Sequence, residues 1–172
     1  MCIRDSHTVT LKDIFSEAQK LITLAIEKKL TLATAESCTG GLICAAITAI
    51  PGSSVVFRGG IIAYDNAVKT KLLGVSPSVL GKYGAVSQKT AERMAAGAME
   101  RLGVDIAVSV TGIAGPGGGT PDKPVGTVWM GIAKKDSVSA RRFEFGDIGR
   151  NKVRDVTCFE GLKALASTLN TI

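Results

Sequence analysis

Residues 30–41, which read LTLATAESCTGG, decide the fold of this chain. The apolar run Leu30–Ala35 has the length of a buried strand and ends at Glu36. The turn around Ser37 follows, and the residues from Gly40 to Ile50 have the pattern of a helix. The passage therefore predicts a buried strand that leads directly into a helix, which is the repeating unit of α/β proteins.

The rest of the chain continues this alternation. Apolar spacing and capping residues predict further helices over Thr8–Lys29, from Asp65 to Gly74, as a short turn at Ser76-Pro77, over Ser87–Leu102 and over Asn151–Leu169. Strands are expected at Val55–Tyr64 and Asp105–Thr111, and in a hairpin of Val128–Ala133 and Ala140–Phe145 joined through Lys134–Ser139. These elements predict a three-layer α/β/α sandwich around a mixed sheet. We expect residues 8–172 to form a single domain and residues 1–7, which lead into no pattern, to be a non-native leader.

The composition of the chain limits the kinds of partner that the protein can bind. The chain has 172 residues, of which 45% are hydrophobic and 21% charged, so it is long enough and apolar enough for a packed core. Its net charge of +6 favours anionic partners. Aromatic residues are only 5% and the basic residues are scattered, so no nucleic-acid partner is expected. No apolar run is long enough for a membrane span or a secretion signal, which predicts a cytoplasmic protein.

The scarcity of histidine excludes several kinds of catalysis. His7 is the one histidine and falls in the expected leader, so Ser-His-Asp and Cys-His mechanisms lack their base. The four cysteines, Cys2, Cys38, Cys44 and Cys158, form no Cys-x-x-Cys pair and are expected to be free, buried thiols. No phosphate-binding P-loop motif occurs. We therefore expect neither a metal nor an organic cofactor.

Ser37 is the candidate nucleophile, because it lies where the predicted strand passes into the predicted helix. Free backbone N–H groups at such a junction can bind a phosphate or an oxyanion. A serine that merely caps the helix explains the same residue equally well. Without histidine, a lysine of lowered pKa is the usual base, and Lys69 and Lys71 follow the second strand and Tyr64. Most lysines are instead solvated surface charges, and most tyrosines pack in a core.

A glycine-rich loop, Gly112–Gly119, leaves the end of the strand Asp105–Thr111. Ligands of α/β sheets bind near the carboxyl ends of strands, so this loop is a candidate binding element. It matches neither Gly-x-Gly-x-x-Gly nor a P-loop. A flexible surface connection is the alternative interpretation.

Several motifs in the same order resemble the CinA C-terminal domain family over about Leu11–Leu169. They are Ala35–Gly41, Pro51–Ser54, Phe57, Gly60, Tyr64, Lys69, Gly84–Ser87, Thr111–Pro116 and Lys123–Val128. That family includes stand-alone nicotinamide mononucleotide amidohydrolases, so the resemblance implies hydrolysis of the nicotinamide amide to nicotinate mononucleotide and ammonia. It also implies a homodimer. The rival interpretation is a catalytically degenerate binding or dimerisation module.

The resemblance also assigns site residues. The family's nucleophile falls on Ser37, and its tyrosine and lysine partners fall on Tyr64 and Lys69. A site arginine is expected after the last strand, where the spacing departs from the family's Gly-Asp-Arg run; Arg150 is preferred and Arg154 is the alternative. The remaining residues expected to bind substrate are Thr39, Gly40, Gly41, Gly112 and Gly115.

Overall fold

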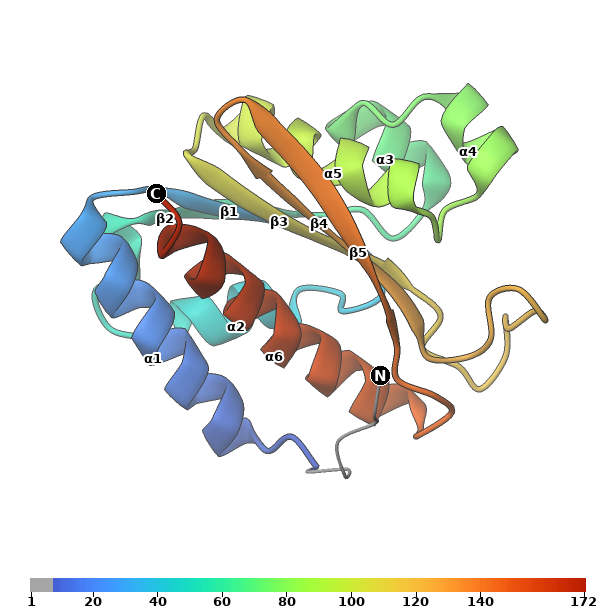
Figure 1. Cartoon of the computed structure of the whole chain (residues 1–172), viewed down its shortest axis with the longest axis horizontal. Helices are drawn as coiled ribbons and strands as arrows, with labels where there is room; N and C mark the ends of the chain where they lie inside the picture. Colours follow the sequence, from blue (N-terminus) through green and yellow to red (C-terminus); the bar gives the residue numbers. More distant parts are fainter. Residues whose placement is uncertain (1–7) are drawn as a thin grey trace.

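A mixed five-stranded sheet forms the centre of the molecule (Figure 1). The structure is a computed structural model and describes residues 8–172. The strands are β1 (Leu32–Glu36), β2 (Phe57–Ile62), β3 (Ile106–Gly112), β4 (Thr127–Lys134) and β5 (Ser137–Glu144), in the spatial order β2-β1-β3-β4-β5. Strand β1 pairs in parallel with β2 and β3, whereas β3–β4 and β4–β5 are antiparallel. The mixed sheet predicted from the sequence is confirmed.

Helices cover both faces of this sheet, which confirms the three layers (Figure 1). One face carries α1 (Leu11–Lys28), α2 (Leu42–Thr48) and α6 (Arg150–Leu169). The other carries α3 (Asn66–Leu73), α4 (Pro77–Tyr83) and α5 (Gln88–Leu102). No helix within residues 8–172 is both long and apolar enough to cross a membrane.

Local sequence explains why these elements form. Thr10 and Asp13 make a capping box at the start of α1, and five residues on one stripe of that helix are buried. All five residues of β1 are buried, as expected of a central strand covered on both faces. The apolar run that predicted β1 therefore supplies the middle of two hydrophobic clusters, one on each side of the sheet.

The connections after β1 and β2 place the candidate site. The chain leaves the carboxyl end of β1 and enters α2 on one face, whereas it leaves β2 and enters α3 on the opposite face. Because β1, β2 and β3 are parallel, their carboxyl ends lie at the same edge of the sheet. Chains that diverge to opposite faces leave a crevice at such an edge, where ligands of α/β proteins bind.

Some element boundaries differ from those predicted. The hairpin of β4 and β5 closes through the two residues Lys135 and Asp136, not through a six-residue loop, and Asp136 has a left-handed φ of 60°. A 3-10 turn, Ser53–Val55, occupies the start of the predicted second strand. Ser76-Pro77 begins a full helix, α4, because Ser76 caps it and proline suits a first helical turn. The leader expected at residues 1–7 lies outside the described residues.

Candidate active site

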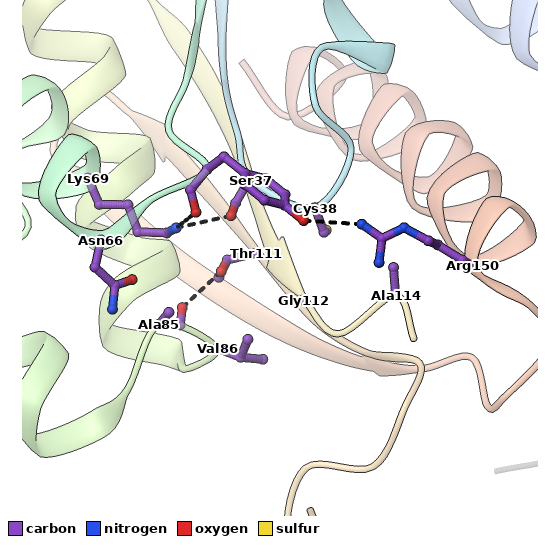
Figure 2. Close-up of a pocket in the computed structure, with 11 residues that line it drawn as sticks. Ser37, Cys38, Asn66, Lys69, Ala85, Val86, Thr111, Gly112, Ala114 and Arg150 are labelled. Atoms are coloured by element: carbon purple, nitrogen blue, oxygen red, sulfur yellow. Dashed lines mark hydrogen bonds between the residues drawn. The ribbon is translucent and has the colours of Figure 1, made fainter. Parts of the chain in front are cut away.

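A cavity of about 180 Å³ opens at the carboxyl ends of the parallel strands. Ser37 and Thr111 line it from the ends of β1 and β3, and Tyr64 and Lys69 line it from the segment after β2 and from α3. Arg150, the first residue of α6, lines it from the other face of the sheet. The cavity thus gathers residues from distant parts of the sequence, including all three expected catalytic residues. Ser37 and Lys69 are labelled in Figure 2.

Ser37 and Lys69 form the central contact of this cavity. Lys69 Nζ donates a hydrogen bond to Ser37 Oγ at 3.0 Å and a second one to the carbonyl oxygen of Tyr64 at 3.1 Å (Figure 2). Only 1% of Lys69 and 7% of Ser37 is exposed. A serine hydroxyl within hydrogen-bonding distance of a buried amine is the arrangement that a nucleophile and its base require.

Burial also changes the chemistry of Lys69. It lowers the pKa of the amine from its usual value of 10.5, because desolvation disfavours the charged form; the negative charge of Asp65 opposes this only in part. Within residues 8–172, no carboxylate lies within ion-pair distance of Nζ. A lowered pKa increases the fraction of neutral amine, which is the form that can accept the Ser37 proton over the same 3.0 Å contact.

Helix α3 distinguishes Lys69 from Lys71. Asp65 caps the helix by accepting a hydrogen bond from the Ala67 N–H at 2.7 Å. One turn further on, Lys69 faces the interior, whereas Lys71 is exposed to solvent. The two lysines that the sequence left open as bases are therefore separated by their position on one helix.

Tyr64 contacts Lys69 through its backbone and not through its phenol. Its side chain is 63% exposed, and its hydroxyl accepts a hydrogen bond from Arg150 Nη2 at 3.1 Å. The family resemblance pairs Tyr64 with Lys69, and in the structure the carbonyl oxygen of Tyr64 makes that contact. The phenol lies on the rim of the cavity together with the arginine.

The two candidate arginines lie one turn apart on α6 and have different surroundings. Arg150 lines the cavity, where its Nη1 donates to the Gly115 carbonyl at 2.8 Å. Arg154 is not among the lining residues and instead donates to the carbonyl oxygens of Cys38 and Thr39. The geometry therefore favours Arg150 as the arginine that a substrate would contact.

The glycine-containing turn after β1 is placed differently from the expectation. Of the residues expected to bind substrate, Gly112 and Arg150 line the cavity. Gly115 does not line it, but its carbonyl accepts a hydrogen bond from Arg150. Thr39, Gly40 and Gly41 are not among the lining residues. Gly41 has a left-handed φ of 105°, and a Cβ there would lie 3.1 Å from Ile62 Cδ1, so this turn requires glycine for close approach to β2.

A buried carboxylate, that of Glu36, occupies the N-terminus of α2. Its Oε1 accepts hydrogen bonds from Thr39 Oγ1 at 2.7 Å and the Ile43 N–H at 2.9 Å, and its Oε2 accepts one from the Cys44 N–H at 3.0 Å. Glu36 is fully buried. The sequence alone predicts Glu36 only as the end of a strand, and it predicts that the helix N-terminus receives a substrate anion. The protein's own carboxylate binds there instead.

Cys38 is a poor nucleophile in this setting. The residue lines the cavity but is only 5% exposed, and burial raises the pKa of its thiol to about 12. The dipole of a helix N-terminus would lower that pKa, but desolvation dominates here. The thiol therefore stays protonated at neutral pH, as a small apolar side chain does in a core. Cys44 and Cys158 are also free.

Two polar residues of the cavity were not singled out from the sequence as site residues. Asn66, which the sequence placed only in the first turn of a helix, has its side chain in the lining beside Lys69 (Figure 2). Thr111 Oγ1 donates to the Ala85 carbonyl at 2.8 Å and so joins β3 to the segment before α5. Their positions depend on which strands are neighbours, which local patterns do not reveal. No group of side chains suited to hold a metal ion occurs in residues 8–172.

Fold and cavity together define a class of protein: an α/β sandwich with a serine–lysine pair at the carboxyl ends of its parallel strands. A model of the CinA C-terminal domain matches residues 15–169. A "CinA-like protein" from Leptospira borgpetersenii serovar Hardjo-bovis (strain L550) is 48% identical over 162 residues, which cover 94% of this chain and 38% of that protein. The chain therefore belongs to the CinA C-terminal domain family.

Solved structures agree with this assignment. The crystal structure of competence/damage inducible protein CihA from Agrobacterium tumefaciens matches with a TM-score of 0.88 and 42% identity, and the match covers 99% of both chains. A competence-damaged protein (CinA) superfamily protein from Escherichia coli matches with a TM-score of 0.87 and 32% identity over 98% of this chain and 95% of that one. The chain thus spans little more than a third of the curated Leptospira relative, but nearly all of these solved chains.

Proposed function

We propose that this protein is an amidohydrolase that converts nicotinamide mononucleotide to nicotinate mononucleotide and ammonia. One observation carries the proposal: a buried lysine of lowered pKa lies 3.0 Å from a buried serine in a cavity at the strand ends. That pair supports acyl transfer without histidine, metal or cofactor. The resemblance to nicotinamide mononucleotide amidohydrolases within the family supplies the substrate.

In the proposed reaction, neutral Lys69 takes the proton of Ser37 Oγ while that oxygen attacks the carboxamide carbon. A bond forms between Oγ and carbon, and the carbonyl electron pair moves to oxygen. When this pair returns, the carbon–nitrogen bond breaks and ammonia leaves with the proton held by Lys69. Water then attacks the acyl ester by the same route and releases the carboxylate product and free Ser37.

The charge of the protein and the size of the cavity support a phosphorylated substrate whose amide lies inside the cavity. A cavity of about 180 Å³ is smaller than most ligand sites, so it suits only part of a nucleotide, such as one ring with its carboxamide. The remainder of a nucleotide would lie at the rim, where the exposed Arg150 guanidinium can bind phosphate. The net charge of +6 favours approach of such an anion.

Ammonia release from nicotinamide mononucleotide tests the proposal, with free nicotinamide as the matched substrate. We expect a much larger kcat/KM for the nucleotide, because binding of the remote phosphate contributes to catalysis at the amide. Activity should survive exhaustive treatment with EDTA. Equal kcat/KM for both compounds would contradict the proposed substrate. Binding of the nucleotide without turnover would favour the degenerate binding module.

Location and assembly also belong to the proposal. We expect the enzyme to act in the cytoplasm, as a homodimer that binds neither nucleic acid nor membranes. Size-exclusion chromatography with light scattering, at the concentration used for the ammonia assay, tests the dimer. A monomer with full activity would show that the site needs only one chain.

A further inference from the structure

One polar side chain of the cavity has no partner in the protein. Asn66 lines the cavity and is exposed to solvent, and within residues 8–172 no hydrogen bond uses its carboxamide. It is not needed to cap α3, because the neighbouring Asp65 carboxylate already accepts a hydrogen bond from the Ala67 N–H at 2.7 Å. The helix therefore leaves the Asn66 carboxamide available to a ligand.

The other nitrogen- and oxygen-bearing side chains of the lining are already hydrogen-bonded. Their bonds join Lys69 to Ser37, Arg150 to Tyr64, and Thr111 to the Ala85 carbonyl. Val86 and Ala114 contribute apolar side chains. Asn66 is thus the polar contact that a ligand can gain without breaking a hydrogen bond inside the protein.

Asn66 lies on the side of the cavity from which Lys69 acts. The two residues are three positions apart on α3, so their side chains lie on one face of that helix. Figure 2 shows the Asn66 carboxamide beside the Lys69 side chain, on the side of the cavity away from Arg150. A ligand group that approaches Lys69 from the cavity therefore also meets the Asn66 carboxamide.

The proposed reaction places the amino group of the substrate in this position. The leaving nitrogen takes its proton from Lys69, so the carboxamide must bind with its nitrogen toward Lys69 and its oxygen turned away. That nitrogen carries two N–H donors, and the asparagine side chain has an oxygen that can accept one of them. A planar carboxamide can bind in two orientations, and a contact with Asn66 selects the reactive one.

We propose that Asn66 is a specificity-determining residue, whose Oδ1 accepts a hydrogen bond from the amino group of the substrate's carboxamide. The inference rests on the proposed function and deepens it, because it names the residue that recognises the amide. A methyl ketone of the same shape keeps the carbonyl group but has no N–H to donate. The site should therefore bind the ketone less tightly than the amide.

Two ligands that differ only in this group test the inference. They are nicotinamide mononucleotide and 3-acetylpyridine mononucleotide, in which a methyl group replaces the amino group. Isothermal titration measures both Kd values in a Ser37→Ala background, which prevents turnover. In that background, Asn66→Leu removes the carboxamide, whereas Asn66→Asp keeps an oxygen that accepts a hydrogen bond. Asn170→Leu, at the exposed far end of α6, is the control substitution.

With Asn66 present, the amide should bind about tenfold more tightly than the ketone, which is the effect of one hydrogen bond. Asn66→Leu should weaken binding of the amide about tenfold and change binding of the ketone less than about threefold, so the preference disappears. Asn66→Asp should retain the preference, because its carboxylate accepts the same N–H. Asn170→Leu should leave both Kd values unchanged. Thermal unfolding checks that each variant is folded, as expected for substitutions at exposed positions.

A preference for the amide that survives Asn66→Leu overturns the inference, as does equal binding of the two nucleotides when Asn66 is present. If Asn66→Leu does not fold, Asn66→Ala takes its place. If neither nucleotide binds and the wild type releases no ammonia, the proposed substrate fails. Free nicotinamide and 3-acetylpyridine, observed by ligand NMR, are then compared in the same variants. A preference for nicotinamide that Asn66→Leu abolishes supports the role of Asn66, and any other result overturns it.

Discussion

The inner wall and the rim of the cavity differ in how their residues are held. On the inner wall, Ser37 and Lys69 are almost completely buried and joined by a 3.0 Å hydrogen bond. On the rim, Tyr64 and Arg150 are exposed and joined by one hydrogen bond across the opening. Bond making needs fixed, desolvated groups, whereas recognition of a charged ligand tolerates solvent. The comparison assigns chemistry to the inner wall and recognition to the rim.

Substitutions on the inner wall should have the largest effects. Ser37→Ala is expected to lower kcat at least about a thousandfold, the scale seen when a nucleophile is removed. Substrate binding should survive, because the rim is unchanged. Ammonia release and isothermal titration of the same sample measure both quantities. A folded Ser37→Ala enzyme with kcat near that of the wild type would remove Ser37 from the mechanism.

Lys69 and Lys71 offer a matched pair on one helix. Lys69→Arg should be nearly inactive, because arginine stays protonated and cannot act as a base, whereas Lys71→Arg on the exposed face should be close to wild type. Steady-state kinetics with a thermal unfolding control distinguish lost chemistry from lost fold. Lys69→Met, which is neutral, replaces the arginine variant if that one does not fold. Activity in either Lys69 variant, or equal losses at both positions, would contradict the assignment.

A substitution on the rim should change binding more than chemistry. Arg150→Met removes the guanidinium from the mouth of the cavity, so KM for nicotinamide mononucleotide should rise about tenfold, the size of one charge-assisted contact. The kcat should change much less. Kinetics on free nicotinamide serve as the control, because that compound has no phosphate for Arg150 to bind. An equal loss on both compounds would place Arg150 in the chemistry instead.

Cys38 should contribute least to activity, although it lies beside the nucleophile. Cys38→Ala should keep most activity and cost about 1 kcal/mol of unfolding free energy, because it removes a small buried side chain. Iodoacetamide should leave the native enzyme largely active, since burial raises the thiol pKa to about 12. If Cys38→Ala is inactive while Ser37→Ala works, the mechanism involves a thioester.

Local patterns predicted most of the fold, because strands and helices of this chain carry clear apolar periods. The apolar run before Glu36 predicted β1, and the alternation of helices and strands predicted three layers around a mixed sheet. The pairing of Ser37 with Lys69 came from excluding histidine and from the family resemblance. Composition could not reveal that α3 turns Lys69 inward and Lys71 outward, since that depends on where the helix begins.

The surroundings of the turn after β1 were the least predictable part of the site. The sequence suggested that a substrate anion binds at the N-terminus of α2, but Glu36 folds back and occupies those N–H groups. Arg154 contacts the same turn at Thr39, which lies 115 positions before it in the chain. Contacts over such separations depend on the packing of α6 against the sheet, and no local motif encodes them.

The protonation of Lys69 tests the central claim most directly, because a general base must be neutral when the serine proton moves. An NMR titration of the lysine side chains, with the Lys69 signal assigned by its absence in Lys69→Arg, measures the pKa without any substrate. We predict a Lys69 pKa below the usual 10.5, lowered by desolvation in the cavity. The ascending limb of kcat/KM against pH should then have the same midpoint. A Lys69 pKa at or above 10.5 would contradict its role as the base for Ser37.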